Sequence, residues 1–343
     1  MRRHPTALMV VAGVIASAIG IVLALAIDWF PTIAATQSER VSTLYDVLLI
    51  ASVPIFVLVM TVVIAAVIRF RMRPGQEDQD GPPMHGNTRL EVVWTVLPAL
   101  LILGLCVYAY TVLEDIEKAP AAAQELRVGV QGEQFAWTFT YPQETTGGEE
   151  LTTTELVLPV DRSVRFDIRT ADVIHDFWVP EFSMKIDAVP GITTHYRVTP
   201  NRLGTYPVVC AELCGLGHSV MRSRVRVVQP PEFQRWLEEQ SQPAVEADAG
   251  PAEQAAAGKQ IFASEGCGGC HTLADAGSGG QIGPNLDEVL KGVDDAKIRE
   301  DIVDPDAQIT AGYGPGIMPS TFGQTLSDSE LTALVAYLKE ATK

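Results

Sequence analysis

Three long apolar runs occupy the first third of the chain, at residues 6–27, 47–68 and 92–113. Each is about twenty residues long, the length at which an α-helix spans the hydrocarbon core of a bilayer. A helix buried in a soluble core would be shorter or would show a polar face. The pattern therefore predicts helices that cross a membrane.

Basic residues beside these runs predict their orientation. Arg69, Arg71 and Arg73 directly follow the second run, and cytoplasmic segments carry the excess of Lys and Arg. The loop after them is therefore expected in the cytoplasm, and everything after the third run is expected outside. The first run is either a signal peptide, with the Ala-Leu-Ala triplet at residues 24–26 as its cleavage site, or a retained helix.

A different pattern follows at residues 126–228, where short apolar alternations are broken by Gly, Pro, Asp and Asn. This two-residue period is typical of half-buried strands, so we expect a small β sandwich or barrel. After Trp236 the composition turns to Gln, Ser, Pro, Ala and Glu, which is typical of a flexible linker. A helical domain is expected beyond the linker, because Ser327 and Glu330 form a capping box ahead of an apolar stripe.

The chain is therefore expected to be multidomain, with transmembrane helices, then an all-β domain, then an all-α domain. The expected domains are 1–40, a signal peptide or first transmembrane helix with an exposed loop; 41–120, a transmembrane helical hairpin; 121–235, the β domain; 236–252, the linker; and 253–343, the helical domain.

Acidic residues outnumber basic ones, and the whole chain has a formal net charge of −17. Residues 253–343 hold 14 acidic against 6 basic residues, a net of 8 negative charges. Such a surface repels nucleic acid and does not recruit an acidic protein. Both classes of partner are therefore excluded.

The segment from Cys210 to Met221 carries the ligand types of a metal site. Two thiolates, from Cys210 and Cys214, can each bridge two copper ions, with one imidazole for each metal from His218 and the more distant His175. Met221 and a backbone carbonyl can fill weak axial positions. Soft thiolate and thioether ligands with imidazoles favour copper over hard cations, and a rigid site of this kind suits electron transfer.

Two plainer interpretations use the same cysteines. Cys210 and Cys214 could form a disulfide, or the two Cys and two His could bind zinc. Neither interpretation explains the methionine at position 221.

Cys267, Cys270 and His271 form the C-x-x-C-H pattern by which haem c is attached. Two thiols at this spacing add to the vinyl groups of one haem, and the following His is placed to ligate the iron. No His and only one Met, Met318, lies C-terminal to His271, so Met318 is the expected second axial ligand. The alternative is an exposed loop methionine with a vacant or water-bound iron. The fifth cysteine, Cys106, is expected to be a small buried hydrophobe.

Glu91 is an ionisable residue at the mouth of the third apolar run. An ionisable residue in this position is a functional candidate, and proton handling is the first role to consider. The alternative is an interfacial anchor, with Glu91 solvated beside Trp94.

In combination, these motifs resemble subunit II of cytochrome c oxidase joined to a class I cytochrome c. The resemblance covers nearly all of the chain after Tyr45. It rests on two membrane helices, on the C-x-x-C-H tail, and on His85-Gly-Asn with Leu90-Glu-Val-Val-Trp-Thr and Pro98, His175-Asp-Phe-Trp-Val-Pro180 and the segment Cys210 to Met221.

The resemblance implies a cupredoxin fold with a dinuclear copper A centre at residues 121–235, and a cytochrome c fold at residues 253–343. The implied copper ligands are His175, Cys210, Cys214, His218, Met221 and the backbone carbonyl of Glu212. The resemblance also implies that the Glu212 carboxylate contacts magnesium at the interface with subunit I. It places Glu91 near the entrance of a proton channel in subunit I.

The expected function is that of an electron-input subunit of a respiratory oxidase in the cell membrane. Electrons pass from an external donor, a cytochrome or a membrane cytochrome complex, through haem c and dinuclear copper to the oxygen-reducing subunit I, coupled to proton translocation. The expected partners are subunits I and III, and both metal domains lie on the outer face. One alternative is the electron-delivery subunit of a related nitric oxide reductase. The other is a membrane-tethered metal-binding protein.

One departure from the resemblance concerns electron entry. The family often has Gln-Trp-x-Trp, whose first Trp receives electrons from docked soluble cytochrome c, whereas this chain has Gln134-Phe135-Ala136-Trp137. Phe135 cannot be oxidised or form hydrogen bonds as an indole can. Either Phe135 and Trp137 are only core aromatics, or docking by an external carrier is altered because the haem domain is tethered.

Overall fold

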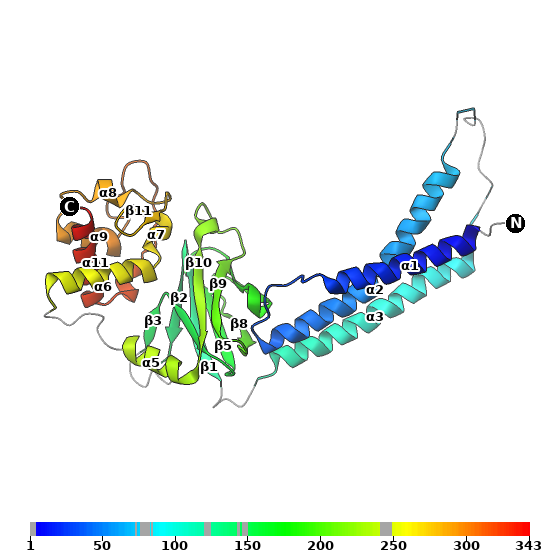
Figure 1. Ribbon diagram of the computed structural model, residues 1–343, viewed down its shortest axis with the longest axis horizontal. Coiled ribbons are helices and arrows are strands. Elements are labelled where there is room, and N and C mark those ends of the chain that lie inside the picture. Colours follow the sequence, from blue (N-terminus) through cyan, green and yellow to red (C-terminus); the bar gives the residue numbers. More distant parts are fainter. Residues whose placement is uncertain are drawn as a thin grey trace. The chain divides into compact units, whose positions relative to one another are not determined.

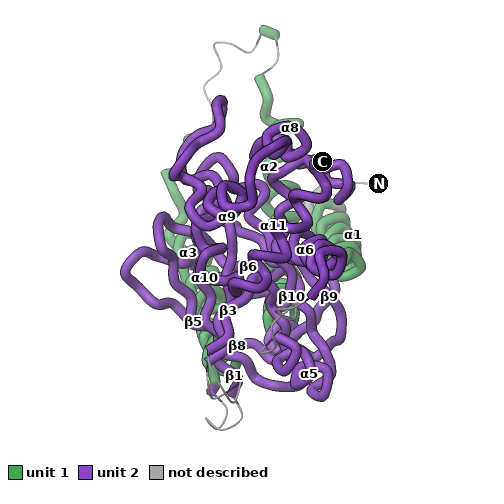
Figure 2. Tube along the Cα trace, turned by 90° about the vertical axis from the view of Figure 1, so that its left-hand side faces the viewer, with its two compact units in different colours: residues 1–31, 39–118 green, residues 32–38, 119–343 purple. Residues whose placement is uncertain are grey.

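The computed structural model describes residues 5–72, 74–75, 83, 85–119, 125–142, 145, 150–240 and 249–343. The chain divides into two compact units (Figure 2). Unit 1 comprises Met1–Pro31 and Glu39–Lys118, and unit 2 comprises Thr32–Ser38 and Ala119–Lys343. Unit 1 holds the long apolar helices, and unit 2 holds a β domain followed by a helical domain (Figure 1).

Three long helices make up most of the described part of unit 1: α1 (Pro5–Ala26), α2 (Thr36–Phe70) and α3 (Thr88–Glu117). All three are long and apolar enough to cross a membrane, and most of their large apolar side chains are exposed. Apolar surface on helices of this length is suited to contact with lipid. The predicted membrane helices are therefore confirmed.

The helices α2 and α3 extend beyond the apolar runs that predicted them. Their polar ends continue the helix beyond the length that spans the hydrocarbon core of a bilayer. Between these ends, Arg40 of α2 forms an ion pair with Asp115 of α3 at 3.2 Å. A Cβ atom at Gly20 would lie 2.8 Å from the Val53 side chain, so the missing side chain lets α1 approach α2 closely. The helix α1 ends at Ala26, the last residue of the Ala-Leu-Ala triplet, and both alternatives for this segment stay open.

The β domain consists of two five-stranded sheets. The first has the order β3 (Leu151–Thr153), β2 (Ala136–Tyr141), β1 (Leu126–Glu133), β5 (Val164–Thr170), β8 (Thr194–Val198). The second has the order β4 (Leu156–Pro159), β10 (Arg222–Val228), β9 (Gly204–Cys210), β6 (His175–Val179), β7 (Met184–Ala188). The predicted strand-rich domain is confirmed.

The inner faces of the two sheets enclose an aromatic core. Phe177 of the second sheet packs against Phe139 and Phe166 of the first, with ring centroids 6.3 and 5.4 Å apart. Helix α5 (Pro230–Gln240) closes the end of this core, because Trp236 packs edge-on against Tyr141 at 5.1 Å. The domain boundary expected at residue 235 therefore falls inside α5. Of the expected linker, residues 241–248 lie outside the described residues.

The helical domain is built around two long helices, α6 (Pro251–Ser264) and α11 (Asp328–Ala341). Gly258 of α6 lies directly against the Ala333 backbone of α11, where any side chain would collide. The predicted capping box is confirmed, since Ser327 Oγ accepts from the Glu330 amide and the Glu330 carboxylate accepts from the Ser327 amide. The shorter elements are α7 (Cys267–Cys270), β11 (Thr272–Leu273), β12 (Ser278–Gly279), α8 (Leu286–Val289), α9 (Asp295–Val303) and α10 (Phe322–Thr325).

Candidate metal centre

The segment from Cys210 to Met221 lies at one end of the second sheet. Strand β9 ends at Cys210 and β10 begins at Arg222, so the segment connects two antiparallel neighbours. Strand β6 begins with His175, and its Phe177 pairs with Cys210 from the other side of β9. The register of the sheet therefore brings His175 to the segment across a separation of 35 residues.

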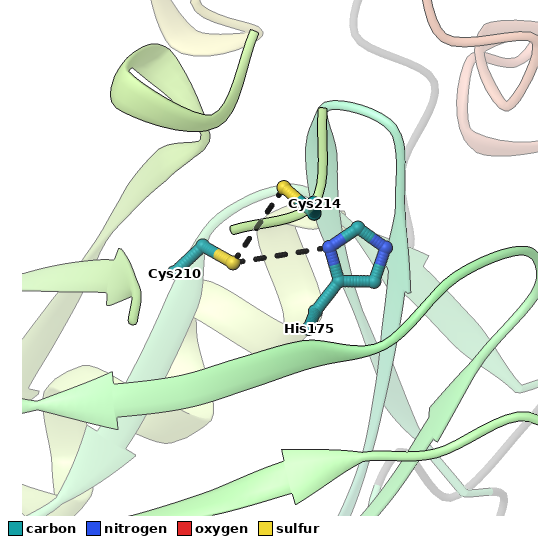
Figure 3. Close-up of side chains that lie close together, drawn as sticks. All are labelled: His175, Cys210 and Cys214. Atoms are coloured by element: carbon teal, nitrogen blue, oxygen red, sulfur yellow. Dashed lines mark hydrogen bonds between the residues drawn. The ribbon is translucent and has the colours of Figure 1, made fainter. Parts of the chain in front are cut away.

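His175, Cys210 and Cys214 form a buried cluster (Figure 3), in which one ligand atom from each residue lies within 4.8 Å of the others. The two Sγ atoms are 3.8 Å apart, and Cys210 Sγ is also 3.8 Å from His175 Nδ1. The Glu212 carbonyl oxygen lies 3.2 Å from Cys210 Sγ. Cys210 therefore has one imidazole and one backbone carbonyl beside it.

Cys214 has the matching environment on the other side of the cluster. Its Sγ lies 3.6 Å from His218 Nδ1 and 3.7 Å from Met221 Sδ. Each sulfur thus has its own imidazole and its own weak donor. Such a donor set of thiolates, imidazoles and a thioether fits a soft metal ion, and a His/Cys/Met set in a cupredoxin-like domain suggests copper.

A carboxylate that the sequence interpretation missed fixes the orientation of His175. The Asp172 carboxylate lies 2.8 Å from His175 Nε2, so this nitrogen carries the proton and Nδ1 faces the sulfur. The amides of Gln134 and Val173 donate to the same carboxylate at 2.7 and 2.6 Å. Metal-binding imidazoles are commonly held through their second nitrogen in this way. An Asp three residues before a predicted His ligand is the sequence signal that could have revealed it.

The two thiols differ in their electrostatics. Burial raises the pKa of the Cys210 thiol, but hydrogen bonds to His175 and to backbone groups outweigh it and lower the pKa to about 7. Burial, followed by the charge of Cys210, raises the pKa of the Cys214 thiol to about 12. Of the two thiols, that of Cys210 is therefore the one that loses its proton more readily.

The cysteines of the C-x-x-C-H pattern line a cavity of about 510 Å³ in unit 2, together with His271 and Met318. His271 Nδ1 donates to the Pro284 carbonyl at 2.9 Å, which leaves Nε2 as the free ligand atom. Burial lowers the pKa of His271, so the ring is neutral. A Cβ atom at Gly283 would lie 2.5 Å from the His271 ring, so only glycine permits this contact. The residues present therefore fit a covalently attached haem c.

Met318 belongs to the same cavity, at the end of a Gly/Pro loop. The loop is fixed by the Asp306 carboxylate, which accepts from the Gly316 amide at 3.0 Å. Met318 packs against the core of the helical domain. The structure thus brings the expected axial methionine to the haem cavity, and its role as an iron ligand stays a prediction.

Glu91 and Cys106 lie in unit 1. Glu91 is exposed in the first turn of α3, and its Oε1 accepts from the Asn87 amide at 3.0 Å, which caps the helix. A structural role is therefore visible for Glu91, while its role in proton handling stays a prediction. Cys106 was expected to be buried, but it is exposed, because the helix face that carries it contacts no other described part of the chain.

Three family descriptions match successive parts of the chain. Residues 20–112 match the transmembrane domain of cytochrome c oxidase subunit II, residues 148–228 match its periplasmic domain, and residues 255–342 match cytochrome c. The fold and the two sites thus define a membrane-anchored cupredoxin-like protein fused to a cytochrome c domain.

Relatives of known name agree. The cytochrome c oxidase subunit 2 of Thermostichus vulcanus is 34% identical over 258 residues, covering 60% of this chain and 76% of the relative. That of Alkalihalophilus pseudofirmus is 32% identical over 307 residues, covering 86% of this chain and 84% of the relative. The crystal structure of the periplasmic domain of cytochrome oxidase subunit II of Bradyrhizobium japonicum is 32% identical, covers 36% of this chain and 97% of that chain, and has a TM-score of 0.33.

The chain belongs to the cytochrome c oxidase subunit 2 family. It is an oxidase subunit in the membrane with a periplasmic β domain, called the copper domain below. The alternatives of a nitric oxide reductase subunit and of a metal-binding protein are therefore not retained.

Proposed function

We propose that this subunit carries electrons from an external donor through haem c and a dinuclear copper centre to the oxygen-reducing subunit I of a respiratory oxidase. The observation that carries the proposal is the paired donor set at Cys210 and Cys214, with one imidazole and one weak donor beside each sulfur. A mixed set of this kind accepts and releases an electron with little rearrangement when the protein holds it rigidly.

The proposed ligand assignment follows the geometry. The copper ligands are His175, Cys210, the Glu212 carbonyl, Cys214, His218 and Met221. Cys267 and Cys270 attach haem c, and His271 and Met318 ligate its iron. When bound, the two groups supply one-electron chemistry, while the chain supplies rigid ligands and a dry environment.

Burial supports an electron-transfer role for the copper domain. His175 and Met221 are fully buried, and Cys210 and Cys214 are 2% and 4% exposed. Burial of these four side chains would limit the access of water to a metal held there, and the sheet on both sides of Cys210 restrains the ligands. Exclusion of water and restraint of ligands both reduce the reorganisation that accompanies electron transfer.

Several roles toward partner subunits belong to the same proposal. The Glu212 carboxylate contacts magnesium at the interface with subunit I, Glu91 lies at the entrance of a proton channel, and subunit III completes the complex. Electron input is coupled to proton translocation by subunit I. The segment from Cys210 to Met221, called the copper segment below, carries two exposed leucines that support a protein interface here, since Leu213 is 77% exposed and Leu216 is 93% exposed.

Electron paramagnetic resonance of the purified oxidase tests the copper assignment. One unpaired electron shared by two copper nuclei gives a multi-line hyperfine pattern, which we expect. A single-copper spectrum, or tightly bound zinc without copper, would contradict the dinuclear centre. Stopped-flow reduction tests the order of transfer, since haem c is expected to be reduced by the donor before copper.

A further inference from the structure

A strip of arginines runs along the outer face of β10 in the copper domain. Arg222, Arg224 and Arg226 alternate along the strand, while Val225 and Val227 point into the core. Their cross-strand neighbours on β9 are Val209, Pro207 and Thr205, none of which carries a charge. The three cations, called the arginine strip below, therefore lie in a row beside uncharged residues of β9.

Only one member of the arginine strip has an acidic partner among the described residues. Arg226 forms an ion pair with Glu155 at 2.9 Å. Arg222 donates only to the Ser219 carbonyl at 3.2 Å, and Arg224 has no ion pair within the part of the chain that the structure describes. Both Arg222 and Arg224 are exposed. Two adjacent cations without counter-charges attract an anionic surface.

The arginine strip also lines the cavity that holds the C-x-x-C-H pattern, within unit 2. The cytochrome c domain contributes Asp301 and Asp306 to this cavity but no Lys or Arg; Glu265 lines it as well, but burial raises the pKa of its carboxyl to about 7. With its net of 8 negative charges over residues 253–343, the domain is complementary to the strip in sign. Charge complementarity of this kind steers docking and fixes its register.

Two hydrogen bonds between described residues join the same two domains. Thr154 Oγ1 donates to the Glu265 carboxylate at 2.9 Å, and Ser320 Oγ donates to the Glu133 carboxylate at 3.0 Å. Thr154 is itself tied to β10, because Ser223 Oγ donates to its carbonyl at 2.9 Å. Polar contacts at two separate points accompany the charge complementarity.

The position of the strip links the cavity to the copper segment. Arg222 directly follows Met221, and both Val220 and Phe135 line the cavity beside it. The Phe135 ring packs against Gly217 and lies 3.0 Å from a Cβ built at Gly215, both in the copper segment. A cytochrome held on the strip is therefore next to the residues that carry the copper ligands.

We propose that the arginine strip is the docking surface on which this chain binds its own acidic cytochrome c domain for electron transfer to the copper segment. The same positive surface disfavours direct docking of lysine-rich soluble cytochromes, which would meet Arg222 and Arg224. This proposal rests on the proposed function, because it assumes that haem c precedes copper in the path.

The test uses the complete purified oxidase with Arg222→Glu and Arg224→Glu combined. The matched control combines Arg127→Glu and Arg169→Glu, two exposed arginines on the other sheet that change the charge by the same amount. After rapid photoreduction of haem c, the rate of electron transfer to copper is followed optically. We expect the strip variant to be slower by on the order of tenfold and the control to stay within about twofold of the native rate.

Spectra of the two metal sites and the dependence of the rate on ionic strength distinguish a loss of docking from damage to the sites. The haem absorption spectrum and the copper hyperfine pattern should be unchanged in both variants. Raising the ionic strength from about 0.05 M to about 0.5 M should slow the native protein and leave the strip variant nearly unaffected.

The outcomes distinguish this proposal from the one it rests on. If the strip variant transfers electrons at the native rate, or if both variants slow equally, the docking surface is wrong while the relay stands. If copper in the native protein is reduced without passage through haem c, the proposed function itself fails.

Electron input from outside gives a second measurement. In oxidase carrying Cys267→Ser and Cys270→Ser, a lysine-rich soluble cytochrome should reduce copper faster when the strip is also reversed. Equal rates with and without the strip variant would contradict the selectivity part of the proposal.

Discussion

The copper site and the haem site differ in what holds their ligands. In the copper domain, His175 and Cys210 belong to paired strands, and their spacing follows from the hydrogen-bonded register of the sheet. In the cytochrome c domain, His271 follows a four-residue helix and Met318 lies in a loop, and both line a cavity. The first site is formed by the fold, whereas the second is formed around its cofactor.

The cores of the two domains show the same difference. The copper domain has a continuous core of its own, including Phe139, Phe166 and Phe177. In the cytochrome c domain, core residues such as Phe322 and Leu334 themselves line the haem cavity. Loss of copper should therefore leave the copper domain folded, whereas loss of haem should destabilise the fold of the cytochrome c domain.

The largest effect is expected from Cys267→Ser with Cys270→Ser. Without covalent attachment, the absorption of haem c should disappear completely, and the cytochrome c domain should become sensitive to protease because its core surrounds the cofactor. The copper hyperfine pattern should be unchanged. Cys106→Ser is the matched control and should alter neither signal. A protease-resistant domain without haem would break the comparison.

His218→Ala should nearly abolish electron flow beyond haem c. The substitution removes the imidazole that lies 3.6 Å from Cys214 Sγ, and we expect transfer from haem c to subunit I to fall by at least about 100-fold. The copper domain should remain folded, as measured by protease resistance and circular dichroism. His195→Ala, at an exposed position on β8, should behave as the native protein. Full oxidase activity of the His218 variant would contradict the relay.

Met318→Ala should change haem c without releasing it. A methionine axial ligand raises the reduction potential, so its loss should lower the potential by more than about 0.1 V, out of the roughly 0.8 V that axial ligands span. Redox titration and the haem absorption spectrum measure this change. An unchanged spectrum and potential would show that another group ligates the iron.

Asp172→Asn tests the sheet-built site more gently. The amide can accept from the His175 ring but carries no charge, so copper affinity should fall by about tenfold with the hyperfine pattern altered but present. Competition with a copper chelator measures the affinity. Asp167→Asn on β5, whose partner is Arg165, is the matched control. An equal effect of both substitutions would indicate a general change of charge.

The sequence predicted the parts of the fold that depend on local pattern. Apolar runs located the three membrane helices, and the Ser327–Glu330 pair located the last helix. Ligand chemistry singled out Cys210, His218 and Met221 before their distances were known. These features depend on residue type and on short spacings along the chain, which can be read directly from the sequence.

Features that depend on long-range packing were not predicted. Asp172 was missed because its role follows from the orientation of the His175 ring, and the exposure of Cys106 follows from which helix faces pack together. The apolar alternation within residues 126–228 predicted strands, but what the arginines of β10 face depends on tertiary structure. Helix α5 was mistaken in part for linker, because polar composition concealed the burial of Trp236.

The smallest effect is expected from Phe135→Trp. The Phe135 ring already packs tightly against Gly215 and Gly217, so a larger indole forces a local shift that costs about 1–3 kcal/mol. An indole can also be oxidised and can donate a hydrogen bond, which phenylalanine cannot do.

In oxidase that lacks the tethered haem, direct reduction of copper by soluble cytochrome should therefore rise severalfold, measured as turnover under saturating donor. With the tethered haem present, turnover should hardly change, because delivery is then intramolecular. No gain in the haem-free protein would mean that Phe135 is only a packing residue beside the copper segment, and that the tether, not this side chain, decides how electrons enter.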